Sequence, residues 1–294
     1  MIKHSINGLQ LNDNMLVCYN YIPLLADVGI DDSREEYSKW GVTRLHDLVF
    51  DTVADNSIIF VKIDKLNDHG TRLFINSKIQ DKRNIILLSG VGANPPSQEA
   101  ISFVRSLLDK GILSHWYSTN MPSFGTNDTH HLPIGFEEID RMPNKTQDIL
   151  WQLKDEANKI DKIPGIYIPY HSDTNGLRYE LKRKRQDKIG IVVNIEESKL
   201  SFIEYMRQLS KYTHVACFPG AGDDTHRVYE TIWMGGIPIH WNTRMFTKWC
   251  DEYKILHTNG YKFIEDSCID FNERQNTDIT PFLVKTYYDK TRTK

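Results

Sequence analysis

The chain has 294 residues, of which 40% are hydrophobic and 26% are charged, and its formal net charge is −3. This length is enough for one large domain or two modest ones, and the composition is typical of a globular protein in water. A slightly negative chain has no general attraction for nucleic acid or for an anionic membrane surface, so any phosphate binding has to be local. We therefore expect no nucleic-acid partner.

The cysteines and the N-terminus indicate the compartment. The four cysteines are far apart and none forms a C-x-x-C pair, so neither a zinc ribbon nor a disulfide framework is indicated. The N-terminus lacks a basic segment followed by an apolar one, and no apolar run approaches the roughly 18 residues of a membrane span. We expect a soluble cytoplasmic protein with reduced thiols and no membrane anchor.

The first half of the chain alternates predicted strands and helices, with an acidic loop after the first strand. The expected strands are 15–22, 57–63, 84–88 and 112–117, and the expected helices are 97–110 and 145–160. Ser97 suits the N-cap of the helix over 97–110, and Gly111 suits the position after its end. The glycine pair at 90 and 92 is too incomplete for a dinucleotide fingerprint, because Pro95 takes the third glycine position.

The second half is a cleaner alternation of strands and helices. The expected strands are 165–170, 189–194, 213–218, 237–241 and 254–256, and the expected helices are 198–211, 225–234 and 243–250. Such a series predicts an α/β fold with a mostly parallel sheet and right-handed crossovers.

The most informative stretch is 215–241, which reads as a strand, a glycine loop, a helix and a second strand. Gly220 and Gly222 permit a backbone turn that is closed to residues with a Cβ. Residues 223–225 (Asp, Asp and Thr) are all good N-cap types, so a helix is expected to begin there. The N-terminus of such a helix attracts phosphate.

Polar residues crowd this loop and helix, although the two flanking strands read as buried. Arg227 and Glu230 lie at i and i+3 and so share one helix face. They could form a structural ion pair in an ordinary strand–helix corner. The density of polar groups favours a ligand site instead.

A second polar loop, 172–178, follows the predicted strand 165–170. Ligands of open α/β sheets bind beyond the carboxyl ends of the strands, so both loops should lie at one edge of the sheet. Arg178 begins a basic helix there and is a candidate anion ligand. Lys182 lies one turn later on the same face, within a basic run that also suits a solvated helix surface.

The absence of several motifs narrows the chemistry. No two aspartates are separated by one residue, so the D-x-D pair of metal-dependent glycosyltransferases is missing. There is also no GxxxxGK[ST] loop and no G-x-S-x-G turn. Arginine and backbone N–H groups can instead stabilise a diphosphate leaving group without a metal. The sequence therefore favours metal-independent transfer from a sugar nucleotide.

Residues 218–239 resemble the signature of exostosin-like glycosyltransferases. In that family a proline–glycine loop leads into Asp-Thr-His-Arg, then an aromatic residue, Glu, and a strand beginning Ile-Pro-Ile or Ile-Pro-Val. In this chain the Asp-Thr-His-Arg run is Asp224 to Arg227, the aromatic residue is Tyr229, the glutamate is Glu230 and the strand begins at 237–239. Weaker matches at 58–64, 132–135 and 174–178 follow in family order. The likeness extends from about residue 57 to 242 and is strongest to the short members of microbes and large viruses. The loop at 220–223 and Thr231-Ile depart from the usual pattern.

The resemblance implies a GT-B fold, with two Rossmann-like domains facing a cleft. Its expected parts are an acceptor-binding domain (1–150), a nucleotide-sugar-binding domain (151–275) and a final segment (276–294) that packs back on the first domain. It also implies a UDP-sugar donor, no metal cofactor, and inversion at the anomeric carbon. By the same resemblance, Arg227 and Arg178 bind the diphosphate and Glu230 binds the ribose. The expected donor-site residues are Asn175, Arg178, Lys182, Gly220, Gly222, Asp224, Thr225, His226, Arg227 and Glu230.

Inversion requires a base on the acceptor side, in the first half of the chain. Asp64 is the first candidate and His69 the second, followed by Asp27, His130 and His131; Asp64 could equally cap the helix after it. The donated sugar is expected to be a pentose such as xylose, and the acceptor a glycan hydroxyl. Two alternatives remain: a non-catalytic module that binds sugar nucleotides or glycans, and a GT-B enzyme that uses a GDP-sugar such as GDP-fucose.

Overall fold

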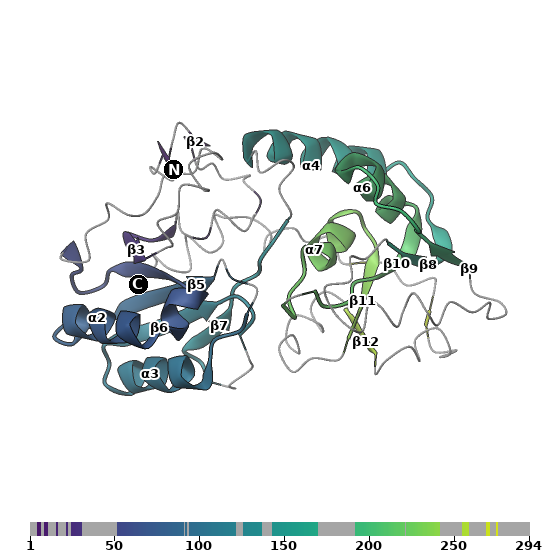
Figure 1. Cartoon of the computed structure of the whole chain (residues 1–294). Helices are drawn as coiled ribbons and strands as arrows, with labels where there is room; N and C mark the ends of the chain where they lie inside the picture. Colours follow the sequence, from purple (N-terminus) through teal and green to yellow (C-terminus); the bar gives the residue numbers. More distant parts are fainter. Residues whose placement is uncertain are drawn as a thin grey trace. The chain divides into compact units, whose positions relative to one another are not determined.

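The computed structural model describes two α/β units (Figure 1). Its described residues are 52–90, 92, 94–121, 126–136, 143–169, 192–220 and 222–241, with short pieces at 5–6, 9–10, 16, 22, 25–30, 255–258, 269–270 and 275. The first unit is built mainly on Met1–Asn144 and the second on Lys145–Ile279. The predicted helix 243–250 and the predicted packing of 276–294 lie outside the described residues, as does most of the predicted strand 15–22.

The first unit contains a parallel five-stranded sheet in the order β3-β4-β5-β6-β7. Its strands are β3 (Val28–Ile30), β4 (Ile58–Lys62), β5 (Ile85–Gly90), β6 (Leu113–Ser118) and β7 (Thr129–His131). A separate antiparallel pair is formed by β1 (Ser5–Ile6) and β2 (Leu9–Gln10). Strands β3 and β7 were not predicted, because three residues are too few for a periodic pattern.

Three helices pack against one face of this sheet: α1 (Ile63–Asn67), α2 (His69–Ile79) and α3 (Gln98–Asp109). The core between them includes Ile59, Leu87 and Trp116 from the sheet and Val104 from α3. The predicted N-cap of α3 is confirmed, since Ser97 Oγ accepts a hydrogen bond from Ala100 N at 3.2 Å. Gly111 follows α3 with φ +66°, as expected of a glycine just after a helix.

The second unit has a parallel sheet in the order β12-β11-β10-β8-β9. Its strands are β8 (Ile163–Ile168), β9 (Val192–Ile195), β10 (Tyr212–Ala216), β11 (Ile237–Trp241) and β12 (Leu256–Thr258). The chain runs from β8 to β9 on one side and then returns to place β10 on the other side of β8. The direction of winding therefore reverses between β8 and β10.

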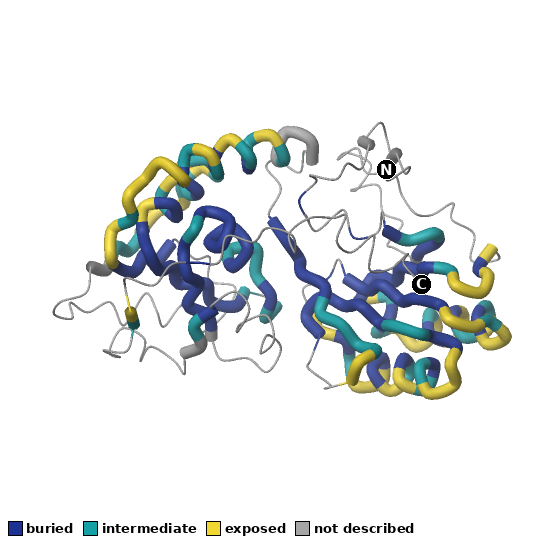
Figure 2. The backbone as a smooth tube through the Cα atoms, turned by 180° about the vertical axis from the view of Figure 1, so that it is seen from behind, coloured by how far each residue is buried: buried dark blue, intermediate teal, exposed yellow. Residues whose placement is uncertain are grey.

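In the described part of the second unit the helices are α4 (Pro143–Ala157), α6 (Phe202–Ser210) and α7 (His226–Trp233). Helix α6 begins four residues later than predicted because Ser201 and Glu204 form a capping box, in which each side chain bonds the other's backbone N–H. In both units the strands are mainly buried, whereas the helices expose an outer face (Figure 2). Within the described residues, no helix is long and apolar enough to cross a membrane.

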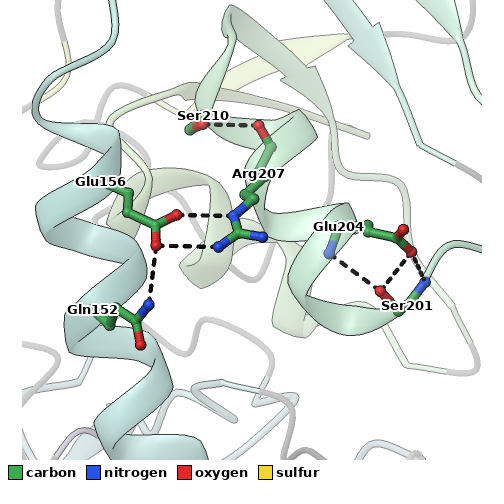
Figure 3. Close-up of polar contacts among 6 residues, drawn as sticks. All are labelled: Gln152, Glu156, Ser201, Glu204, Arg207 and Ser210. Atoms are coloured by element: carbon green, nitrogen blue, oxygen red, sulfur yellow. Dashed lines mark hydrogen bonds and ion pairs between the residues drawn. The ribbon is translucent and has the colours of Figure 1, made fainter.

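Side-chain contacts join α4 to both α6 and α7. Arg207 on α6 pairs with Glu156 on α4 through two N–H donors, at 2.9 and 3.2 Å, as Figure 3 shows. On α7, the Trp233 indole N–H donates to the Leu150 carbonyl of α4 at 2.8 Å. The Trp233 ring also meets Trp151 edge-on, with the centroids 4.9 Å apart. These contacts fix α7, which carries Arg227 and Glu230, against α4.

Candidate functional site

The second sheet has a topological switch between β8 and β10. These strands are adjacent and parallel, with Tyr167 in register with Val215. The chain therefore leaves both strands at the same edge of the sheet. In doubly wound sheets with this type of strand order, a ligand binds beyond the carboxyl ends of the strands at the switch point. The glycine loop 219–225 follows β10 at this edge.

The loop after β10 is held by contacts from α7 and β11. A turn closes between Gly220 N and Gly222 O at 3.0 Å. The His240 ring on β11 is 1% exposed, and its Nε2 lies 3.0 Å from the Asp223 carbonyl oxygen, to which it can only donate. Tyr229 on α7 donates its hydroxyl to Asp224 Oδ2 at 2.9 Å. Asp224 is therefore an anchor of the loop, with its carboxylate directed to α7.

Helix α7 starts within one residue of the predicted position. Thr225 is the N-cap residue, but its side chain makes no capping hydrogen bond, and the first turn closes through Val228 N and Thr225 O at 3.0 Å. Thr225 therefore does not supply the side-chain cap that an N-cap threonine usually gives to the first turn. His226 and Arg227 are the first two residues of this turn. The positive end of the helix dipole points to the switch-point edge.

Arg227 and Glu230 meet at the hydroxyl of Tyr205, which comes from α6. Tyr205 Oη donates to Glu230 Oε2 at 2.7 Å and accepts from Arg227 Nε at 3.2 Å. The guanidinium also lies over the Tyr205 ring, with Cζ 5.6 Å from the centroid. Glu230 is only 3% exposed. The two residues do share one face of α7, and a third side chain lies between them.

The electrostatics of this cluster keep Arg227 charged and Tyr205 neutral. Burial alone would lower the pKa of the Arg227 guanidinium, but Tyr205, Cys217 and Glu230 outweigh it, so the pKa is raised above its ordinary value. Burial, and then the negative charge of Glu230, raise the pKa of the Tyr205 phenol well above its usual range. Tyr205 is therefore a neutral donor to Glu230 at physiological pH.

Helix α7 lies on one face of the sheet beside β10. The thiol of Cys217, just after β10, lies 3.5 Å from the Arg227 carbonyl and 3.3 Å from Thr231 Oγ1. The opposite face carries an apolar cluster of Ile166, Ile168, Ala216, Phe218 and Ile239. Tyr167 alternates with those β8 residues and so lies on the α7 face. Its buried hydroxyl has no hydrogen-bond partner among the described residues, which is uncommon for a buried polar group.

Asp64 lies at the carboxyl edge of the sheet in the first unit. It is exposed in the first turn of α1, which directly follows β4. The loop after β5 passes beside it, since a Cβ added at Gly92 would lie 3.4 Å from Asp64 Oδ1. Asn120, which follows β6, donates to the Gly92 carbonyl at 3.4 Å. The alternative role of Asp64 as a helix cap is wrong, because α1 begins at Ile63, before Asp64.

The other base candidates lie elsewhere in the first unit. His69 is exposed at the start of α2, whose N-cap is Asp68. Asp27 accepts from the Ile58 N–H at 2.8 Å and so lies at the amino ends of β3 and β4, the edge opposite to Asp64. His130 on β7 has Nε2 3.1 Å from His115 Nδ1 and stacks on Tyr117. Among these candidates, only Asp64 is an exposed carboxylate that lies at the carboxyl end of a strand.

Asn175, Arg178 and Lys182 lie outside the described residues, within the segment 170–191 that follows β8. In the part of the chain that is described, no group of three or more His, Cys, Asp or Glu side chains is arranged to hold a metal ion. Comparison with protein-family models and with curated proteins found no match for this chain.

The structure adds three residues that the sequence did not single out for the site: Tyr205, Tyr229 and His240. Tyr229 and His240 stand inside the stretch 215–241, but the pattern does not show that they hold its loop. Tyr205 is one aromatic residue on an amphipathic helix, where the usual expectation is core packing. No local signal separates it from Phe202, so only the packing of α6 on α7 identifies it.

Proposed function

We propose that this chain is a metal-independent, inverting glycosyltransferase that moves a sugar from a UDP-sugar to a glycan hydroxyl. The observation that carries the proposal is Arg227 in the first turn of α7, charged and held by Tyr205, beside the switch point of a doubly wound sheet. A diphosphate leaving group needs a fixed cation and N–H donors. The resemblance of residues 218–239 to exostosin-like enzymes supports the same function.

In this proposal the second unit binds the donor. Arg227 and the first turn of α7 stabilise the negative charge that develops on the diphosphate as the glycosidic bond breaks, and Glu230 accepts hydrogen bonds from the ribose. Each well-placed donor of this kind contributes about 3 kcal/mol to lowering the barrier. Arg178, Asn175 and Lys182 complete the expected donor site.

The first unit supplies the acceptor side, in a GT-B arrangement. Asp64 removes the proton of the acceptor hydroxyl as its oxygen attacks the anomeric carbon, and UDP departs from the opposite face. The bond from the sugar to UDP breaks, the bond to the acceptor oxygen forms, and the proton goes to the Asp64 carboxylate. The sugar is proposed to be a pentose such as xylose.

The first experiment measures UDP binding by calorimetry in the presence of EDTA, for the wild type and for Arg227→Ala. Arg227→Ala should weaken binding at least about 10-fold, as expected for a lost charge-assisted contact. Arg207→Ala is the matched control, because this arginine is half exposed and pairs with Glu156 on the outer surface of the same unit. Absence of UDP binding by the wild type would refute the proposal.

The second experiment tests transfer, with a panel of UDP-sugars, glycoside acceptors and detection of products by mass spectrometry. Asp64→Asn should abolish turnover and leave UDP binding intact, because it removes a base but no donor contact. A chain that binds UDP but forms no product with any donor would instead be a binding module. A thermal shift with GDP but not with UDP would indicate a GDP-sugar enzyme.

A further inference from the structure

The proposed donor site depends on two groups of opposite charge, Arg227 and Glu230, that must bind different parts of one ligand. Both reach the same atom, Tyr205 Oη, at 3.2 and 2.7 Å. A tyrosine hydroxyl has one hydrogen and two lone pairs, so it can donate to Glu230 and accept from Arg227 at once. One hydroxyl on α6 thus bonds both groups on α7.

We infer that Tyr205 is the positioning residue of the nucleotide site, because its hydroxyl couples the diphosphate-binding arginine to the ribose-binding glutamate. This inference rests on the proposed function. Phosphate pairs with a guanidinium through parallel N–H groups, and the direction of these groups is set once Nε is held. The Tyr205 ring under the guanidinium restricts the remaining rotation.

The hydroxyl also controls how Glu230 meets a ribose. Tyr205 donates to Oε2 and so fixes the orientation of the Glu230 carboxylate. The direction in which the second oxygen, Oε1, accepts hydrogen bonds is thereby fixed as well. Glu230 is almost fully buried, and a buried carboxylate that lacks a hydrogen bond lowers the stability of the folded chain. The bond from Tyr205 reduces this loss. Because Tyr205 stays neutral, its hydrogen remains on the bond to Glu230 over the physiological range.

The test compares three ligands: UDP, 2′-deoxy-UDP and uridine, by calorimetry. The ratio of the Kd values for uridine and UDP measures recognition of the diphosphate, and the ratio for 2′-deoxy-UDP and UDP measures recognition of the ribose hydroxyl. Tyr205→Phe removes only the hydroxyl and keeps the ring under Arg227. In Tyr205→Phe both Kd ratios should decrease, each by about 10-fold or to unity, because the lost hydroxyl bonds both Arg227 and Glu230.

Tyr212→Phe is the matched control. It removes the hydroxyl from a different tyrosine of the same unit, which is buried and stacks on Tyr167 with the centroids 5.5 Å apart. It should leave both ratios unchanged. A merely structural role of Tyr205 would lower thermal stability without moving the ratios.

A second variant changes Glu230 instead of Tyr205. Glu230→Gln keeps an oxygen that can accept from Tyr205 but weakens that bond, so the preference for the diphosphate should also decrease. A change confined to the ribose preference would show that Glu230 and Arg227 act separately and would overturn the inference.

The outcomes separate this inference from the function on which it rests. UDP binding by the wild type with unchanged ratios in Tyr205→Phe would overturn the positioning role alone. If the wild type binds no UDP, the proposed function and the inference both fail.

Discussion

Lys162 joins the C-terminal ends of α6, which carries Tyr205, and α7, which carries Arg227 and Glu230. Its ammonium donates to the Ser210 carbonyl at the end of α6, at 2.7 Å, and to the Met234 carbonyl after α7, at 2.8 Å. Both carbonyls are among those that a helix end leaves without an internal partner. Lys162 therefore holds α6 and α7 together at one end, as Tyr205 does at the other.

Replacing Lys162 with Met keeps the aliphatic stem and removes both hydrogen bonds. A bond to a charged group contributes about 1.5–3 kcal/mol, and the site is only partly buried, so Lys162→Met should lower the free energy of unfolding by about 2–4 kcal/mol. Urea denaturation followed by circular dichroism measures this loss. Hydrogen exchange should localise it to the amides of α6 and α7.

Lys159→Met is the control, because Lys159 is an exposed lysine just after the end of α4. Its substitution should change stability by less than about 0.5 kcal/mol. The reasoning would be refuted if Lys162→Met cost no more than Lys159→Met, or if the faster exchange appeared elsewhere.

Three further predictions concern the same unit. Burial, and then the charge of Asp224, raise the pKa of Asp223 in the folded chain, so Asp223 contributes stability at low pH that is lost as pH rises through the raised pKa. Asp223→Asn should therefore raise the urea midpoint at about pH 7, and this advantage should shrink as the pH falls through the raised pKa of Asp223 and the carboxyl becomes protonated. A double-mutant cycle of Glu156→Gln and Arg207→Gln should give a coupling that decreases as salt is added, because the pair is exposed; a coupling insensitive to salt would contradict this. Gly235 has φ +76° and lies against Lys162, so Gly235→Ala should lower stability by about 1–2 kcal/mol in thermal unfolding.

Local chemistry made much of the second unit predictable. The strand over 237–241 was predicted with its observed bounds, because Gly235 and Gly236 end α7 and an apolar run follows. The start of α7 was predicted within one residue from the N-cap types at 223–225. The error at α6 has a local cause, since Ser201 offered a better N-cap than Ser198 once Glu204 completed the capping box.

The acceptor-side candidates were harder to separate. Asp64 and Asp27 both stand next to predicted strands or loops, but they lie at opposite edges of the sheet. Which end of a strand an aspartate adjoins depends on where the strand begins, and β3 is too short to be found from periodicity. The sequence placed Asp64 ahead of Asp27, but only the structure shows that the two residues lie at opposite edges of the sheet.

The sequence by itself determined the alternation of strands and helices, the glycine loop after β10 and the shared face of Arg227 and Glu230, because these depend on residues within one or two turns of each other. Only the tertiary structure decided the strand order β9-β8-β10, since hydrogen bonds between strands join residues far apart in the chain. The same holds for Tyr205, which is 22 residues from Arg227 in sequence and meets it only because α6 packs on α7. Long-range packing is not encoded in any local pattern, and that packing assembles the site.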